Sequence, residues 1–188
     1  MTEVSWARGA GRPTRISEAD PAASTPDQLD VAMRCTYNLL WAAAGAGVRR
    51  FVFLSSLRLL DGYDPTFAVT ESWRPVPTTD VTVLCHHLGE YVCREFAREG
   101  RIQVVCLRLG EITPDDDVPP TNWSSALYAD DAVAAVELAL QADLPVVPGE
   151  TKVPSWRIFH IQSDVPRARY ITRTAQETLP FSPARRMP

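Results

Sequence analysis

Three short runs of apolar residues, separated by helical segments, constrain the fold of this chain more than any other feature. The first run is Phe51–Leu54, which closes on two serines; the second spans 102–110 and the third spans 157–161. A run of consecutive apolar residues is typical of a strand that is buried on both faces, as in a parallel sheet. The sequence therefore predicts three such strands.

Helical periodicity occupies the segments between these runs. Apolar residues recur at helical spacing from 29 to about 46, and glycines then end the helix. A second helix is expected from a cap at Thr79 or Asp80 to about Gly100, and a third from about 130 to 142. Alternating helices and buried strands favour an α/β fold with a parallel sheet.

The outer segments differ in composition from this core. Residues 1–27 are rich in Gly, Pro, Ser, Thr, Arg and Asp and show no sustained period, which predicts an irregular arm. Residues 28–165 are expected to form one domain, since 188 residues suffice for a single hydrophobic core. Residues 166–188 are expected to form an Arg/Pro-rich tail with one short helix near 172–178.

Charge and composition argue against several classes of function. The formal net charge is −4 at pH 7, so we expect no nucleic-acid partner, which would demand a basic face. No apolar run approaches the ~18 residues that span a membrane, and the first residues lack the apolar core of a signal peptide. The four cysteines form no CxxC pair, which favours small buried residues over a zinc site or disulfides. We therefore expect a cytoplasmic protein without a membrane partner.

Five short motifs follow one another in a recognisable order. They are Thr36–Leu40 leading into Gly47–Ser56, Thr70-Glu71 with Pro75–Pro77, Leu88–Glu90, Val104–Gly110 and Ala129–Ala132. In this order they resemble the extended short-chain dehydrogenase/reductases of the NAD-dependent epimerase/dehydratase type, and the sugar-directed or uronate-directed members above all. The resemblance implies the C-terminal part of a Rossmann-like, doubly wound parallel sheet. It also implies NAD or NADP as cofactor and a sugar-like small molecule as ligand.

The family reaction, as the resemblance implies it, transfers a hydride between a hydroxyl-bearing carbon and nicotinamide. A tyrosine moves the hydroxyl proton, and a lysine one helical turn later lowers the pKa of that tyrosine. Thr82 stands at the tyrosine position, His86 at the lysine position, and Ser56 at the position of a serine that binds the substrate oxygen. Lys152 is the only lysine and Pro148 lies four residues before it, so no YxxxK motif exists in any register.

Each of these three positions also has an ordinary structural interpretation. Thr82 would lie in the first turn of a helix, where a hydroxyl can satisfy free backbone amides, and His86 would be a partly exposed histidine. His86 could alternatively act as a general base, because an unperturbed imidazole titrates near 6.5. Ser56 could bond a loop backbone, although the carboxyl end of a parallel strand is where α/β sites lie.

The glycine turn that seats a pyrophosphate is missing from the sequence as given. Gly9-Ala10-Gly11 is followed by Thr14 where a third glycine is needed, and no apolar strand precedes it. Gly45-Ala46-Gly47 lies between a helix and a strand, which is the wrong order. We therefore expect the first half of the nucleotide-binding unit to be absent.

Two further sets of residues were considered for a site. Asp115–Asp117 could bind a metal, but beside two prolines a solvated acidic loop is the favoured interpretation. Arg108 and Trp123 could line a substrate pocket, or Trp123 could belong to the core.

These observations lead to competing hypotheses about function. The favoured hypothesis is a catalytically impaired family member that is retained as a binding or assembly module. Its expected partners are a second copy of the chain, packed on helices 28–46 and 80–99, and a sugar-like molecule. The alternative is an active oxidoreductase or epimerase whose N-terminal half is missing or supplied by another chain. A weaker one is an enzyme of altered mechanism that uses Ser56 and His86. A strand 51–55 left at a sheet edge would also invite a partner.

Overall fold

A parallel three-stranded sheet forms the centre of the molecule. The computed structural model describes residues 25–113, 125–144, 155–166 and 168–184. The sheet strands are β1 (Arg50–Ser56), β2 (Gln103–Leu109) and β5 (Trp156–Ile161), in the spatial order β1–β2–β5. Both pairings are parallel, so the carboxyl ends of the three strands meet at one edge. The predicted α/β class is confirmed, because the three apolar runs became these three strands.

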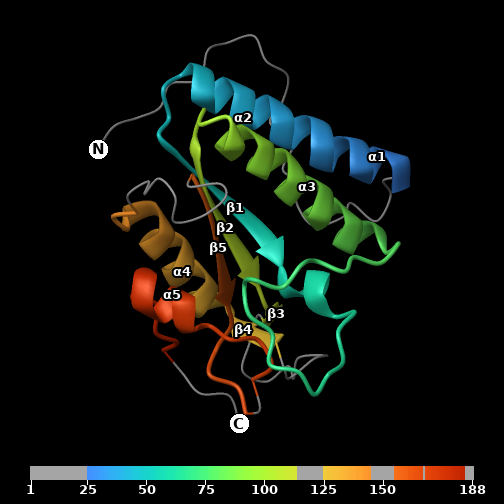
Figure 1. Ribbon diagram of the computed structural model, residues 1–188, viewed down its shortest axis with the longest axis vertical. Coiled ribbons are helices and arrows are strands. Elements are labelled where there is room, and N and C mark those ends of the chain that lie inside the picture. The colour runs from blue at the N-terminus through green and yellow to red at the C-terminus, as the bar shows by residue number, and fades with distance from the viewer. Residues whose placement is uncertain (1–24, 114–124, 145–154, 167, 185–188) are drawn as a thin grey trace.

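Helices cover both faces of the sheet, which gives three layers (Figure 1). One face carries a continuous helical segment and α3, and the other face carries α4 and α5. Their bounds are α1 (Thr25–Asp30), the π-helical η1 (Val31–Cys35), α2 (Thr36–Gly45), α3 (Val81–Arg98), α4 (Ala129–Gln141) and α5 (Arg173–Thr178). The first helical segment begins at residue 25, so residues 25–27 are helical although the sequence analysis assigned them to an arm.

Two apolar clusters lie on either side of β2 and form the core. Toward α2 and α3, Val104 packs with Leu40, Cys93 and Phe96. Toward α4 and α5, the other side of the strand packs against a larger cluster, to which Leu107 belongs. Every residue of β2 except the first is buried, as expected for a strand with a neighbour on each side.

β1 lies at the edge of the described sheet and is less buried than β2. Its residues Arg50–Phe53 are half-buried and Leu54 is exposed. Arg50 fixes the start of the strand, because its Nη1 donates to the carbonyl oxygens of Ala139 and Ala142 at 3.0 and 2.6 Å, at the C-terminal end of α4. On the other face α3 approaches β1 so closely that a Cβ at Gly89 would collide with the ring of Phe53.

Smaller elements surround the carboxyl end of the sheet and were not predicted from the sequence. They are the 3₁₀ turn η2 (Leu57–Leu60) and the parallel pair β3 (Glu111–Thr113) and β4 (Ala126–Tyr128). A single parallel bridge joins Val69 to Tyr170. Leu179 and Phe181 are fully buried in the cluster under α4 and α5. The packed structure therefore continues past residue 165, where the sequence analysis began a tail.

Candidate functional site

Two consecutive serines end β1, and the structure gives them different environments. Ser55 is buried, and its hydroxyl donates to Oε1 of Glu90 at 2.6 Å. Ser56 is half-buried, and its Oγ accepts a hydrogen bond from the backbone N–H of Arg58 at 3.2 Å, which caps η2. Successive side chains of a strand point to opposite faces, so Ser55 faces α3, whereas the candidate residue Ser56 does not.

Helix α3 carries the other two predicted positions in its first two turns. Of the two expected caps, Asp80 is the one used, since its Oδ1 accepts from the N–H of Val83 at 3.1 Å. This hydrogen bond holds the pKa of Asp80 below its usual range. Thr82 is exposed in the first turn, and His86 is half-buried one turn later.

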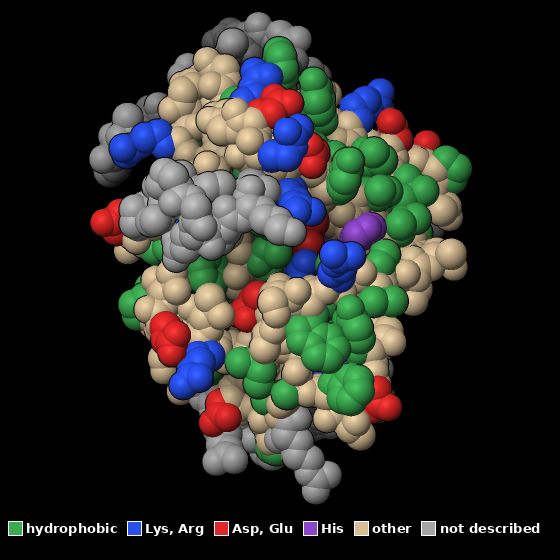
Figure 2. Space-filling view, in the orientation of Figure 1, with side chains coloured by type: hydrophobic (Ala, Val, Ile, Leu, Met, Phe, Trp, Pro, Cys, Tyr) green, Lys and Arg blue, Asp and Glu red, His purple; other side chains and the backbone are tan. Residues whose placement is uncertain are grey.

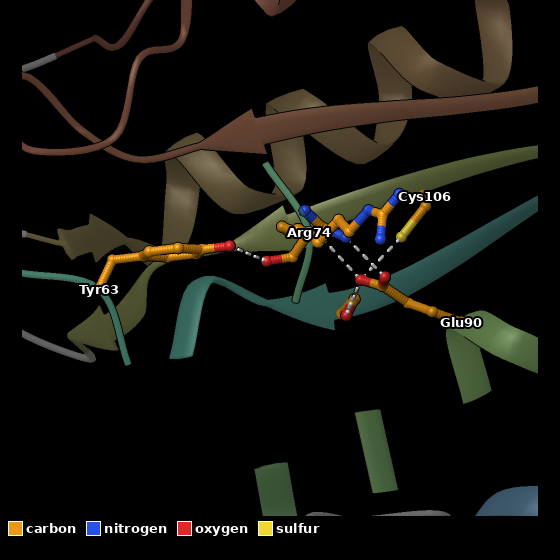
Figure 3. Close-up of polar contacts among 6 residues, drawn as sticks. Tyr63, Arg74, Glu90 and Cys106 are labelled. Carbon is orange, nitrogen blue, oxygen red and sulfur yellow. Dashed lines mark hydrogen bonds and ion pairs between the residues drawn. The ribbon is translucent and has the colours of Figure 1, made fainter. Parts of the chain in front are cut away.

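Glu90 lies one further turn along α3 and is the hub of a buried polar network. Nε and Nη2 of Arg108 each donate to its carboxylate at 2.8 Å, which is the bidentate geometry of a strong ion pair. The thiol of Cys106 also points at Oε1 of Glu90, at 3.5 Å, and Figure 3 shows the Glu90 carboxylate beside this sulfur. Helix α3 is thereby bonded to β1 through Ser55 and to β2 through Arg108.

The environment of Glu90 sets the charge states of its partners. Burial by itself lowers the pKa of Arg108, but the hydrogen bonds and charge of Glu90 outweigh this, so the pKa lies above its ordinary value. Burial, with the charge of Glu90, raises the pKa of the Cys106 thiol well above its usual range. The network therefore holds one carboxylate, one guanidinium and a neutral thiol.

Arg108, which could line a substrate pocket according to the sequence, is 1% exposed and paired with Glu90. An arginine on a central strand is stable only where a carboxylate compensates its charge. The other residues considered with it or for metal binding, Trp123 and Asp115–Asp117, lie outside the described residues.

His160 is another polar residue that the fold buries at this end of the sheet. It pairs in register with Arg108 on the neighbouring strand and is fully buried. Burial, followed by the charge of Arg108, lowers its pKa to about 3, while the backbone of Ile171 partly offsets both. Glu71 lies close by, since its Oε1 accepts from the His160 backbone N–H at 3.4 Å. Neutral His160 thus lies beside Arg108 in the sheet, with the Glu71 carboxylate at its backbone and the Tyr170 ring against its imidazole.

Sequence reasoning missed Glu90, Glu71 and His160 as members of one cluster. One signal was available for Glu90, because it is the single charged residue among the buried positions of α3. Glu71 stands in the Thr70-Glu71 motif, but nothing local predicts its contact with Thr174, 103 residues away, whose hydroxyl donates to Oε2 at 3.1 Å.

The described residues contain no pair that could repeat the family's tyrosine–lysine chemistry. The hydroxyl of Tyr63 donates to the carbonyl oxygen of Arg74 at 2.8 Å, as Figure 3 shows. The hydroxyl of Tyr170 donates to Asp61 at 2.6 Å, and burial raises its pKa above the usual range. Figure 2 shows basic (blue) and acidic (red) side chains near a histidine in the middle of one face, and the described residues contain arginine but no lysine.

The described part of the chain offers neither a glycine-rich turn for a dinucleotide nor a cluster of side chains for a metal ion. The strand–loop–helix unit from β1 to α3 has no glycine-rich turn, and Gly47, with a φ of +75°, ends α2 before β1. Among the described residues, no group of three His, Cys, Asp or Glu side chains could hold a metal. No helix in the described ranges is long and apolar enough to span a bilayer.

The parallel strand order β1–β2–β5 and the helices on both faces define the chain as part of a Rossmann-like, doubly wound fold. Residues 17–113, just over half of the chain, match the NAD dependent epimerase/dehydratase family. The chain therefore belongs to this family, as the motifs predicted. No curated protein matches it.

Several solved structures share the fold at low identity. A mutated uronate dehydrogenase is 20% identical with a TM-score of 0.69, over 87% of this chain and 55% of that one. A glucuronic acid dehydrogenase from Chromohalobacter salexigens is 19% identical with a TM-score of 0.68, over 87% and 57%. MoeE5, solved with UDP-glucuronic acid and NAD, is 18% identical with a TM-score of 0.66, over 87% and 69%. The chain thus spans little more than half the length of the two dehydrogenases.

Proposed function

We propose that this chain is a family member without the proton-transfer chemistry, retained as a binding or assembly module. Its ancestral substrates would be nucleotide sugars or uronates. The observation that carries the proposal is the composition itself, because Lys152 is the sole lysine and Pro148 occupies the position four residues before it. A phenol of ordinary pKa near 10 needs a cationic neighbour to work at pH 7.

The positions that correspond to the family's catalytic groups support the same proposal. Thr82 has a hydroxyl that is too weak an acid to replace tyrosine without a strong base beside it. His86 is the one titratable group of the three, and with Ser56 it would carry any residual chemistry. Ser56, however, is already bonded to the backbone of Arg58. Ser56, Thr82 and His86 therefore correspond in sequence to the family's catalytic residues, but we propose that they catalyse no reaction in this chain.

Turnover assays test this proposal directly. The purified chain is mixed with UDP-glucuronic acid, UDP-glucose or glucuronate and with NAD or NADP, and absorbance at the nicotinamide band is followed. We expect no rate above that of the mixture without protein. The double variant Thr82→Tyr with His86→Lys restores the missing pair, and its inactivity would identify the nucleotide seat as a second deficit. Turnover by the unaltered chain would overturn the proposal.

Nucleotide binding is a separate question from turnover. NAD or NADP is the cofactor by family, but we expect neither to bind this chain alone. Thermal unfolding with NAD(H) and NADP(H) up to millimolar concentration measures this, because a ligand that binds only the folded state raises the midpoint. A rise that saturates would count against a module that does not bind nucleotide.

The proposed assembly partner is a second copy of the chain, packed on the segments 28–46 and 80–99. Large hydrophobic side chains are exposed on these helices, and Figure 2 shows hydrophobic side chains grouped there. They include Met33, Tyr37, Trp41 and Tyr91. The guanidinium of Arg101 lies over the Trp41 ring at 4.2 Å, which holds the indole in place on the surface. Exposed aromatic residues of this kind are enriched at interfaces.

Sedimentation equilibrium tests this partner. We expect the unaltered chain to dimerise, and Trp41→Glu or Tyr91→Glu to weaken the dimer by at least about tenfold, as for central interface residues. Leu140→Glu on α4 is the matched control, since that leucine is also exposed but lies on the opposite layer. A monomer at all concentrations, or equal weakening by the control, would contradict the dimer.

The alternative function is an active oxidoreductase or epimerase whose N-terminal half is missing from this sequence or supplied by another chain. The edge position of β1 favours it, because parallel sheets normally cover and pair such strands. In that case nucleotide binding and turnover would appear only when that half is added, and the double variant would be the more active form.

A further inference from the structure

The network around Glu90 joins two elements that lie far apart in the sequence. Ser55 on β1 and Glu90 on α3 are 35 residues apart, and their side chains are 2.6 Å apart. The same carboxylate holds Arg108 of β2 through two bonds of 2.8 Å. Glu90 is 6% exposed, so water competes little for these bonds.

Glu90 also lies on the same stripe of α3 as the candidate residues Thr82 and His86. Thr82, His86 and Glu90 follow one another at intervals of four residues and therefore lie along one stripe of α3. Glu90 is bonded to Ser55, the penultimate residue of β1, and the candidate residue Ser56 comes directly after Ser55 in the strand. The Ser55–Glu90 hydrogen bond thus fixes where the stripe with Thr82 and His86 lies relative to the end of β1.

The close packing of α3 on β1 strengthens this relation. The ring of Phe53 fills the space beside Gly89, so the helix cannot move toward the strand without displacing that ring. Movement away from the strand would break the Ser55–Glu90 bond and leave a buried charge less well compensated, which is costly. Both directions of movement are therefore opposed at positions 89 and 90.

We propose that Glu90 is a positioning residue that couples the carboxyl end of β1 to the first half of α3, so that the two segments open together. The coupling runs from Ser55 through the carboxylate to the stripe that carries Thr82 and His86. It does not depend on whether α3 dimerises, so the failure of the dimer proposal would leave it standing.

Backbone hydrogen exchange, followed by mass spectrometry on the full chain, tests the coupling. Ser55→Ala cuts the link to β1 and leaves the Glu90–Arg108 ion pair in place. We expect exchange to become roughly tenfold faster or more in both segments, 52–57 and 81–91, while exchange in β2 stays slow. Glu95→Gln is the control, because Glu95 lies on the same helix in an exposed ion pair with Arg98.

A second variant separates coupling from simple stability. Glu90→Leu combined with Arg108→Met replaces the ion pair by apolar groups of similar size, which keeps such a core folded. We expect a cooperative unfolding transition close to that of the original chain, with fast exchange in both segments. Slow exchange in both segments of this double variant, or a Ser55→Ala effect confined to one segment, would overturn the proposal.

Discussion

β1 and β2 are neighbouring strands of the same length in one sheet, yet the fold treats them differently. Leu54 and Leu107 are partners in register, and the first is 47% exposed whereas the second is fully buried. The apolar runs alone do not predict this difference, because each is typical of a doubly buried strand; the expectation that 51–55 lies at an edge rests on the family resemblance. The difference teaches that an apolar run encodes the capacity for burial, whereas the neighbours of a strand decide how much burial it reaches.

The largest effect should come from the ion pair at the end of β2. Arg108→Met would leave the carboxylate of Glu90 buried without its partner, and we expect a loss of about 3–5 kcal/mol in the free energy of unfolding. Ser55, the register partner of Arg108 on β1, contributes one bond to the same carboxylate, so Ser55→Ala should cost about 2 kcal/mol. Urea unfolding measures both losses of stability, and equal losses for the two variants would contradict the expected difference between β1 and β2.

The leucine pair gives a cleaner contrast, because the two changes are chemically identical. Leu107→Ala should cost about 3 kcal/mol, since it leaves a cavity in a closed core. Leu54→Ala should cost less than about 1 kcal/mol, because the side chain is already half in water. If the urea midpoints of the two variants shift equally, Leu54 is covered in solution by a partner or by a segment outside the described residues.

His160 extends the contrast to pH, because it lies on the strand that closes the other side of β2. Its pKa is lowered from 6.5 to about 3, so below pH 6.5 the unfolded chain binds a proton that the folded chain does not. Stability from this group is therefore complete above pH 6.5 and falls as the pH drops toward 3, by about 1 kcal/mol per pH unit.

Urea unfolding at pH 7.0 and 5.5 checks the contribution of His160. His160→Phe should remove it, so the variant should lose less stability on acidification than the original chain. An identical loss in both proteins would mean that His160 is protonated in the folded state or that other groups dominate.

The smallest effect on stability should accompany a charge at the exposed position of β1. Leu54→Lys should change the free energy of unfolding by about 0.5 kcal/mol or less. It should nevertheless lower self-association measured by light scattering, because a lysine on an edge strand opposes pairing with another chain. Val133→Lys on α4 is the control, since Val133 is also an exposed apolar residue, and it should leave scattering unchanged.

The sequence predicted those parts of the fold that depend on local periodicity. The strands at 51–54, 102–110 and 157–161 and the helix capped by Asp80 all appear close to the expected residues. The burial of Phe181 and the bond between Ser55 and Glu90 could not be predicted, because each depends on partners that only the folded chain brings together. The order of the strands was likewise not predicted and comes from the structure.

The candidate site shows the same division. The serines and the α3 positions were found by resemblance, and the absence of a tyrosine–lysine pair follows from counting residues. Which of the two serines faces α3 depends on the face of the sheet to which each strand position points. The sequence at the end of an apolar run does not show this, so the position of Ser55 could not be predicted.

The tight fit of Gly89 against Phe53 bears on how this chain can accumulate mutations. A methyl group at position 89 would meet the far end of a side chain, and Phe53 belongs to the strand that is least enclosed. At Gly110 the added methyl would meet the backbone oxygen of Ser125, which has no rotamer to change. A substitution at Gly89 would thus have to displace the Phe53 ring, whereas one at Gly110 would require the main chain to shift. Evolutionary drift should accordingly be faster along the outer margin of the molecule.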